Sequence, residues 1–347
     1  QYYMSNSSTA APSGYYFIGD AAISTGSERF LYYFDMVNKS VMPLCTKLNC
    51  EHNSQDCDAY VSDKSRVTGG LWYYNNRLYM IERTDEKDLL VSYDKTGRDK
   101  KTEAVLSVNG MSVVSSRQRA CFSHGKLYYI LTSEKTQYLY YVQVGTNTQP
   151  QFIKEYSTVY GIRETITLYP VGEKVYVKLV SGITDVTNDY ILESIDINDN
   201  NVSKVYDYMS DGSIFRGEAD DWNNGAYIDE SGNMYFISLT EDSYILNKMN
   251  TVSKDNEEIF VIDLSQDTGK KEAYTDFLGI DDKYIYILER VDFSIAENRK
   301  NKELKNKLDI LDTKGNIVDV IEFTTNDKYA KENQVGTEGN GLQFDFF

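Results

Sequence analysis

Two short stretches, NNRLYMI at residues 75–81 and HGKLYYI at residues 124–130, share one pattern, in which a polar turn precedes an apolar run around a tyrosine. The phrase recurs as SGYYFI at 13–18, GEKVYVK at 172–178, SGNMYFI at 231–237 and DKYIYIL at 282–288. Its central tyrosines are Tyr16, Tyr79, Tyr128, Tyr176, Tyr235 and Tyr286, at intervals of 48 to 63 residues. Repetition at about 50 residues indicates an array of similar structural units.

Each tyrosine run is followed by a second apolar run that ends in an aspartate and a turn. The aspartates are Asp35, Asp94, Asp196, Asp263 and Asp312, and the third unit has the turn VQVGTNTQ instead. Short clusters of Asp, Asn and Gly between two alternating runs predict hairpins. A further strand-like run follows each turn, namely SVMPL, TEAVLSV, PQFIKEY, VSKVYDY, KKEAYTDF and IVDVIEF.

With an entry strand before each tyrosine run, every unit holds four antiparallel strands, which is typical of a β-propeller blade. We therefore predict an all-β chain with a linker or tether over residues 1–13 and one six-bladed propeller over residues 14–347. Five or seven blades, or two sandwiches or barrels, are the alternatives. The C-terminal GLQFDFF, residues 341–347, is expected to close the first blade, and SIAENRKNKELKNKLDIL, residues 294–311, is predicted to be helical.

The composition narrows the classes of partner. The 36 basic and 53 acidic residues give a net charge of −17, which opposes binding to nucleic acid because phosphate backbones require clustered cations. The sequence has no apolar run of about 18 residues, so we expect no transmembrane helix. Thirty tyrosines and 14 phenylalanines favour strands.

The stretch VMPLCTKLNCEHNSQDCDAY, residues 41–60, contains three of the four cysteines and one of the two histidines. It resembles a motif of extracytoplasmic, often lipid-anchored β-propeller proteins of Gram-positive gut bacteria, in which Pro-Leu-Cys, Cys-x-His and Cys-x-Ala-Tyr recur. Here these are Pro43 to Cys45, Cys50 to His52 and Cys57 to Tyr60. The tyrosine repeats resemble the same group and, more distantly, the low-density-lipoprotein-receptor type of propeller. The resemblance implies fold and compartment and supplies no activity.

Two chemistries fit the cysteine motif. Three thiolates and one imidazole, from Cys45, Cys50, His52 and Cys57, form a complete tetrahedral zinc set, although the spacing is not one of the familiar zinc-finger spacings. Alternatively, two disulfides form among Cys45, Cys50, Cys57 and Cys121, as expected for a protein matured outside the cytoplasm. Free or mixed thiols are the remaining alternative. In each case the role is structural, and we expect no other cofactor.

The connectors that precede the entry strands carry arginines and both tryptophans. The candidate ligand-binding residues are Arg66, Trp72, Arg117, Arg163, Arg216 and Trp222, with Arg119 beside them. Arginine binds carboxylate or phosphate groups with two parallel hydrogen bonds, and tryptophan offers a flat face, so an anionic glycan or peptide is the predicted ligand. The alternative is that the arginines pair with local carboxylates and the tryptophans lie in the core.

The sequence contains no Gly-x-Ser-x-Gly, no His-Glu-x-x-His and no phosphate-binding loop, and we assign no catalytic residue. We predict an extracytoplasmic, monomeric binding module, tethered to the membrane through a removed lipoprotein signal, with a cell-envelope or extracellular glycan or peptide as partner. The alternatives are a propeller-fold carbohydrate-active enzyme, either a hydrolase or a lyase, and a scaffold or sensor domain of an envelope complex.

Overall fold

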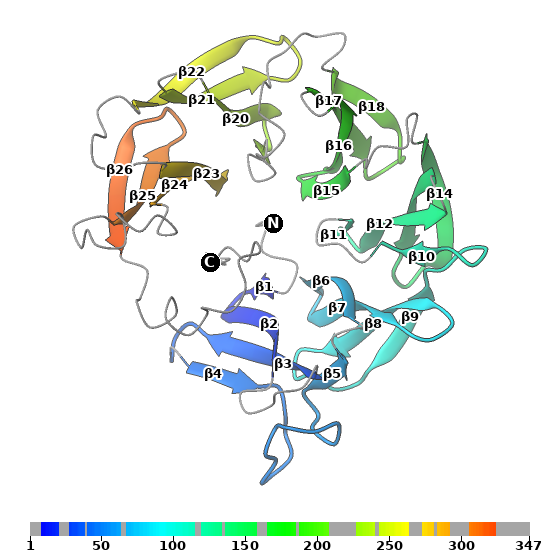
Figure 1. Cartoon of the computed structure of the whole chain (residues 1–347). Coiled ribbons are helices and arrows are strands. Elements are labelled where there is room, and N and C mark those ends of the chain that lie inside the picture. The colour runs from blue at the N-terminus through cyan, green and yellow to red at the C-terminus, as the bar shows by residue number, and fades with distance from the viewer. Residues whose placement is uncertain are drawn as a thin grey trace. The chain divides into compact units, whose positions relative to one another are not determined.

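The computed structural model describes residues 8–20, 28–38, 40–63, 67–114, 119–133, 136–157, 165–184, 187–207, 227–239, 243–263, 273–280, 283–291 and 305–323. These residues form strands and turns, and they include no helix that is long and apolar enough to cross a membrane. The strands build six successive antiparallel sheets, which are the blades of a β-propeller. The predicted fold class and blade number are therefore confirmed (Figure 1).

Each of the six sheets is built from strands that are consecutive in the chain. The first contains β1 (Ser8–Ala11), β2 (Gly14–Asp20), β3 (Glu28–Asp35), β4 (Ser40–Pro43) and β5 (Tyr60–Asp63). The second contains β6 (Val67–Tyr74), β7 (Arg77–Arg83), β8 (Asp88–Asp94) and β9 (Lys101–Val105). The third contains β10 (Ser112–Val113), β11 (Ala120–Ser123), β12 (Lys126–Ser133), β13 (Thr136–Gln143) and β14 (Asn147–Ser157).

The last three sheets have four strands each. The fourth contains β15 (Thr165–Val171), β16 (Lys174–Thr184), β17 (Thr187–Asp196) and β18 (Val202–Asp207). The fifth contains β19 (Tyr227–Ile228), β20 (Asn233–Leu239), β21 (Ser243–Asn250) and β22 (Asn256–Asp263). The sixth contains β23 (Ala273–Ile280), β24 (Tyr284–Val291), β25 (Asn306–Asp312) and β26 (Ile317–Phe323).

The six repeated tyrosines lie on β2, β7, β12, β16, β20 and β24, each of which is the second strand in the pairing order of its sheet, as the sequence predicts. Five of them, Tyr16, Tyr79, Tyr128, Tyr176 and Tyr235, are buried, and Tyr286 is half-buried. Some of their hydroxyl groups still find acceptors, since Tyr16 donates to the carbonyl of Lys95 at 3.0 Å and Tyr235 donates to Asp229 at 3.1 Å. The tyrosine therefore buries an aromatic ring while its polar tip can bond a neighbouring turn.

Two compact units make up the structure, and each has its own hydrophobic core. The first holds the first three sheets and most of the fourth, and the second holds the remainder of the fourth sheet with the fifth and sixth. Within the first unit, the cores lie between consecutive sheets, for example around Tyr79, Phe122 and Leu127 between the second and third. Within the second unit, Tyr235, Ile285 and Leu311 join the fifth and sixth sheets in the same way.

The aspartate turns are confirmed at the ends of β3, β8, β17 and β25. In the second sheet, the carboxylate of Asp94 accepts hydrogen bonds from the backbone N–H groups of Thr96 and Arg98, at 2.8 and 3.0 Å. Gly97 in this turn has a φ of +79°, which favours glycine. The turns at Asp35, Asp196 and Asp312 bond their own backbone in the same manner.

Three details of the sequence interpretation are corrected. In the fifth sheet the third strand is β21, which ends at Asn250, whereas Asp263 ends the outer strand β22. Most of KKEAYTDF belongs to β23, the entry strand of the sixth sheet. Asn250 was missed because its amide oxygen replaces the carboxylate of the other turns, accepting from the N–H groups of Val252 and Ser253. Ser8–Ala11, within the predicted linker, form β1. The last residues of the segment predicted to be helical form the strand β25 instead. The earlier part of that segment, residues 294–304, lies outside the described residues, as does the predicted closing stretch 341–347.

Candidate metal centre

The cysteine motif occupies a loop, residues 44–59, that interrupts the outer strand of the first sheet. The strand β4 pairs with Tyr32 to Asp35 of β3, and β5 pairs with the other end of β3, from Glu28 to Phe30. Both ends of the loop bond to one residue between these segments. The N–H of Leu31 donates to the carbonyl of Ala59, at 2.8 Å, and the N–H of Leu44 donates to the carbonyl of Leu31, at 2.9 Å.

The four candidate ligands form the interior of this loop. Residues 46–49, 51 and 53–56 are exposed, whereas Cys45, Cys50 and His52 are half-buried and Cys57 is buried. Of the two leucines in the loop, Leu44 at its start packs against the core of the first two sheets, whereas Leu48 is 94% exposed and contributes no core. Cys57 packs with the fully buried ring of Phe30 beneath the loop, and Cys45 and Cys50 lie against the same cluster. The thiols are therefore shielded by the sheet on one side.

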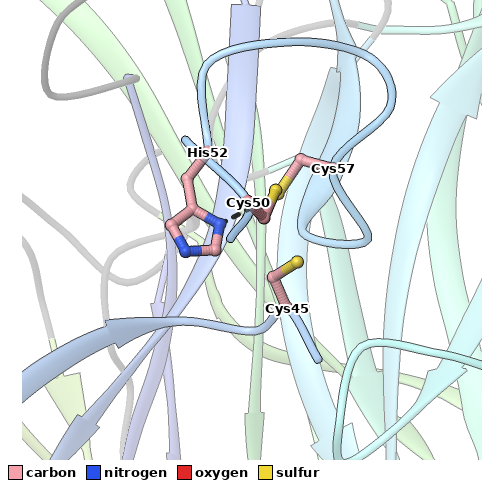
Figure 2. Close-up of side chains that lie close together, drawn as sticks. All are labelled: Cys45, Cys50, His52 and Cys57. Carbon is pink, nitrogen blue, oxygen red and sulfur yellow. Dashed lines mark hydrogen bonds between the residues drawn. The ribbon is translucent and has the colours of Figure 1, made fainter. Parts of the chain in front are cut away.

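The structure brings the four predicted metal ligands together. One ligand atom from each of Cys45, Cys50, His52 and Cys57 lies within 4.8 Å of every other (Figure 2). His52 Nδ1 lies 3.3 Å from Cys57 Sγ. Because three thiols and one imidazole converge from four points of a single loop, the arrangement can bind one tetrahedrally coordinated metal ion.

The backbone of the loop explains how four donors from a short segment can converge. Asn49 and His52 have left-handed backbone, with φ of +60° and +53°, and these reversals turn the chain on either side of Cys50. The N–H of Cys57 donates to the carbonyl of Ser54 at 3.1 Å, which closes a tight turn before the last ligand. The sequence alone did not predict these turns, since neither position carries glycine.

Backbone N–H groups also bond the sulfur atoms. Burial raises the pKa of the Cys45 thiol, but the N–H groups of Lys47 and Asp58 donate to its sulfur and bring this pKa below its ordinary value. Burial raises the pKa of the Cys57 thiol to about 12, although the N–H of Ala59 donates to its sulfur. N–H groups directed at sulfur stabilise thiolates and commonly form the second shell of a metal site.

A polar clasp at the neck of the loop was missed by the sequence analysis. Asp58 accepts a hydrogen bond from the hydroxyl of Thr46 at 3.1 Å and forms an ion pair with Lys47 at 3.3 Å. Lys47 also donates to the carbonyl of Asp56. The signal in the sequence was the acidic residue Asp58, directly after the last cysteine of the loop, together with Thr46 and Lys47, directly after its first cysteine.

The fourth cysteine, Cys121, and the second histidine, His124, lie outside the loop. Cys121 on β11 is buried in the core between the third and fourth sheets, with Tyr128, Ile130 and Ile166. Burial raises the pKa of its thiol far above the ordinary value. All four cysteines carry free thiols in the structure, so no disulfide is present. The second histidine, His124, is exposed in the turn after β11 and bonds the hydroxyl of Ser123 at 2.9 Å.

Most of the predicted ligand-binding residues cannot be placed. Arg66, Arg117, Arg163, Arg216 and Trp222 lie outside the described residues. Trp72, on β6, is half-buried, and its ring stacks on Phe122 with 6.2 Å between the ring centroids. Burial lowers the pKa of Arg119, which donates to Gln137. Trp72 therefore packs against the core, as the alternative interpretation of the tryptophans predicts.

Buried networks of carboxylate, tyrosine and lysine were also missed. On the second sheet, Glu82 accepts from Tyr93 at 2.8 Å and pairs with Lys100 at 2.7 Å. The same combination occurs where Glu193 on β17 bonds Tyr156 at 3.0 Å and Lys154 at 2.6 Å. The signal in the sequence was an acidic residue beside an otherwise apolar run. It did not stand out among the 53 acidic residues of the chain.

The chain matches no protein-family model and no curated protein sequence. Among solved structures it is similar to a prolyl endopeptidase, with a TM-score of 0.51, 10% identity, and coverage of 93% of this chain and 43% of that one. TolB from Acinetobacter baumannii gives a TM-score of 0.44 and 9% identity over 87% of this chain and 61% of TolB. The β-propeller domain of the Trilobed protease from Pyrococcus furiosus gives 0.37 and 11%, with 93% and 98% covered.

The chain thus spans less than two thirds of the length of TolB and of the prolyl endopeptidase. At these identities the similarity concerns the fold alone.

Proposed function

We propose that this chain is a binding module of the β-propeller class, acting outside the cytoplasm, whose sheets are a rigid scaffold for ligand-binding connectors. The proposed ligand is an anionic glycan or peptide of the cell envelope or its surroundings. Binding sites commonly lie on loops that a rigid scaffold positions.

The observation that carries this proposal is that the buried carboxylates named below are bound by other groups of the blades. Glu82 and Glu193 are buried, and each is engaged by a tyrosine hydroxyl and by a lysine. Asp88, which is also buried, is bound by Arg83 at 2.7 Å and by the N–H of Val113 at 2.6 Å. These networks satisfy the polar groups of the sheets internally and stiffen them. The blades therefore fit the role of a support, with recognition left to the connectors.

The chemistry of the ligand follows from the connectors. Arg66, Arg117, Arg163 and Arg216 lie in equivalent connectors before entry strands in a chain of net charge −17. A guanidinium group binds carboxylate or phosphate oxygens in a fixed, two-pronged geometry, and this favours an anionic partner over a neutral one. Trp222 is the remaining aromatic candidate, since Trp72 packs against Phe122.

The test is a binding screen with the full chain on arrays of acidic glycans and acidic peptides. The double variant Arg66→Gln/Arg163→Gln should lose at least tenfold in affinity for any ligand found. The matched control is Lys95→Gln/Lys314→Gln, which removes the same charge from two aspartate turns and should bind normally. Equal binding by both variants would reject the connector site.

The same ligands decide between binding and catalysis. The purified chain should leave a panel of acidic oligosaccharides and polysaccharides chemically unchanged over hours of incubation. Cleavage of a saccharide that depends on residues of this protein would reject the binding-module proposal in favour of a hydrolase or lyase.

A further inference from the structure

We propose that Cys45, Cys50, His52 and Cys57 bind one Zn²⁺ ion, and that this ion is what folds the loop inserted in the outer strand of the first sheet. The inference is independent of the ligand-binding role proposed above. It rests on the donor set, on the distances among the donors, and on the exposure of residues 46–49, 51 and 53–56 between them.

The distances agree with a tetrahedral site. Zinc bonds of about 2.3 Å to sulfur and about 2.0 Å to nitrogen place neighbouring sulfur atoms about 3.8 Å apart and sulfur and nitrogen about 3.6 Å apart. The separation of His52 Nδ1 from Cys57 Sγ is 3.3 Å, and no pair among the four ligand atoms exceeds 4.8 Å. Shifts of about an ångström in an exposed loop therefore complete the coordination sphere.

The donor types select the metal. Thiolates are soft ligands that favour Zn²⁺ over Mg²⁺ or Ca²⁺, and an imidazole nitrogen is a common partner in such sites. Four protein ligands fill the tetrahedral sphere, which is the arrangement of structural zinc; catalytic zinc keeps a position for water or substrate. We therefore assign the ion a structural role.

The loop depends on the ion because it has little else to hold it. Between its ends, residues 46–49, 51 and 53–56 are exposed, so its apolar contacts with the sheet come from Leu44 and Ala59 at the ends and from the cysteines themselves. The two backbone hydrogen bonds of Leu31 hold the same ends. The clasp of Thr46, Lys47 and Asp58 lies at its neck, where exposed ion pairs contribute little stability. In such a segment, the free energy of metal binding becomes the free energy of local folding.

The first experiment measures metal and thiols in the same sample of the full chain, purified without added metal. Native mass spectrometry should find one zinc ion per chain, which a chelator removes and added Zn²⁺ restores. The mass of the denatured chain should not change on reduction, because the ion holds three cysteines as thiolates and no disulfide joins any of the four. A mass increase of two hydrogens per disulfide, without bound zinc, would overturn the proposal in favour of oxidised cysteines.

The second experiment uses matched variants that the chain itself offers. His52 and His124 both have left-handed backbone, with φ of +53° and +49°, a conformation that asparagine tolerates. His52→Asn should weaken zinc binding by more than about 100-fold, since even second-shell changes cost about 10–100-fold. His124→Asn should bind zinc normally. Cys50→Ser and Cys121→Ser form the corresponding pair for sulfur.

Two readouts keep the test decisive if a ligand variant folds poorly. Co²⁺ added to the chelated wild-type chain should give the visible spectrum of a tetrahedral site with thiolate ligands, and Zn²⁺ should displace it. Trypsin should cleave after Lys47 at least tenfold faster when the wild-type chain is stripped of metal, and added Zn²⁺ should restore protection. A metal-free chain that gives no such Co²⁺ spectrum, and whose cleavage rate does not change when Zn²⁺ is added, would reject the zinc site.

Discussion

The loop at residues 44–59 and the core between the second and third sheets are stabilised by opposite means. The core gathers apolar side chains from several strands, among them Tyr79, Phe122, Leu127 and Tyr129, all nearly or fully buried. The loop gathers four polarisable donors and leaves Leu48, which lies between two of them in the chain, 94% exposed. Burial of apolar surface is distributed over many residues, whereas coordination depends on a few.

This difference predicts two kinds of failure. Damage to the core should lower the stability of a whole unit, because its sheets share that core. Loss of the metal should open residues 44–59 while β3 keeps its pairing with β2, which does not involve the loop. Each prediction below changes a feature of a blade, and the first also asks whether the loop is affected.

The largest effect is expected from Phe122→Ala. The ring of Phe122 is fully buried and stacks on Tyr79, with ring centroids 4.8 Å apart. Its removal should reduce the free energy of unfolding by about 3–5 kcal/mol, through lost burial and the cavity that remains. Urea denaturation followed by circular dichroism measures the loss, while zinc content and resistance to trypsin at Lys47 should be unchanged.

Phe152→Ala is the control, because Phe152 is 56% exposed on β14. It should cost less than about 1 kcal/mol. Similar losses for the two phenylalanines, or loss of zinc in Phe122→Ala, would contradict the separation of core and loop.

A smaller effect depends on pH and tests the sixth sheet. Burial, together with a hydrogen bond to Glu289, raises the pKa of Asp309 from 3.8 to about 6, and Lys307 opposes this rise. The folded state then holds the proton more tightly than the unfolded state, so Asp309 lowers stability as the pH rises from about 4 through 6. The difference between 3.8 and about 6 corresponds to at most about 3 kcal/mol.

Asp309→Asn isolates this contribution. Relative to the variant, the wild-type chain should lose stability between pH 4 and pH 7, as measured by urea midpoints at intervals of one pH unit. Both proteins carry the same loop, so acid release of metal cancels in the difference. A difference that does not change with pH would show that Asp309 ionises normally.

The third prediction concerns the network of Glu82, Tyr93 and Lys100. Tyr93→Phe removes the buried hydrogen bond of 2.8 Å to Glu82 and should cost about 2 kcal/mol, since the acceptor is charged. The comparison is Tyr73→Phe, which removes an exposed hydrogen bond of 2.9 Å to Asn76 and should cost less than about 0.5 kcal/mol. Equal losses in chemical denaturation would show that the network adds no more than a surface contact.

The sequence predicted the fold well because the blade is a local pattern. The tyrosine strand and the aspartate turn each lie within about ten residues, and their repetition fixes the period. The fifth unit was misassigned where an asparagine, Asn250, replaced the aspartate. The split of the outer strand into β4 and β5 was not predictable, because it depends on which half of β3 each segment pairs with.

The candidate site was predicted in its residues but not in its geometry. Cysteine and histidine identities restrict the chemistry to metal or disulfide, and spacing could not choose between them. Convergence of the four donors depends on left-handed backbone at Asn49 and His52 and on the bonds of Leu31 to both ends of the loop. Such contacts join residues far apart in the chain, and no local pattern encodes them.

The smallest effect is expected from the aspartate turn of the second sheet. Asp94→Ala removes a carboxylate that accepts hydrogen bonds from the N–H groups of Thr96 and Arg98 and should cost about 1 kcal/mol. Burial raises the pKa of Asp94, but hydrogen bonds from Thr96 and Arg98 bring it below 3.8. The contribution of this turn is therefore present near neutral pH and lost as the pH falls below about 4.

Asp94→Asn decides whether the turn requires a charge or only an acceptor. Asn250 is the corresponding acceptor at the end of β21, in a turn that is one residue longer, and its amide oxygen lies 2.9 and 3.0 Å from the N–H groups of Val252 and Ser253. We therefore expect Asp94→Asn to retain most of the stability that Asp94→Ala loses and to abolish its dependence on acid. If the asparagine variant is as unstable as the alanine variant, the charge is essential in this turn, and the two turns are not equivalent.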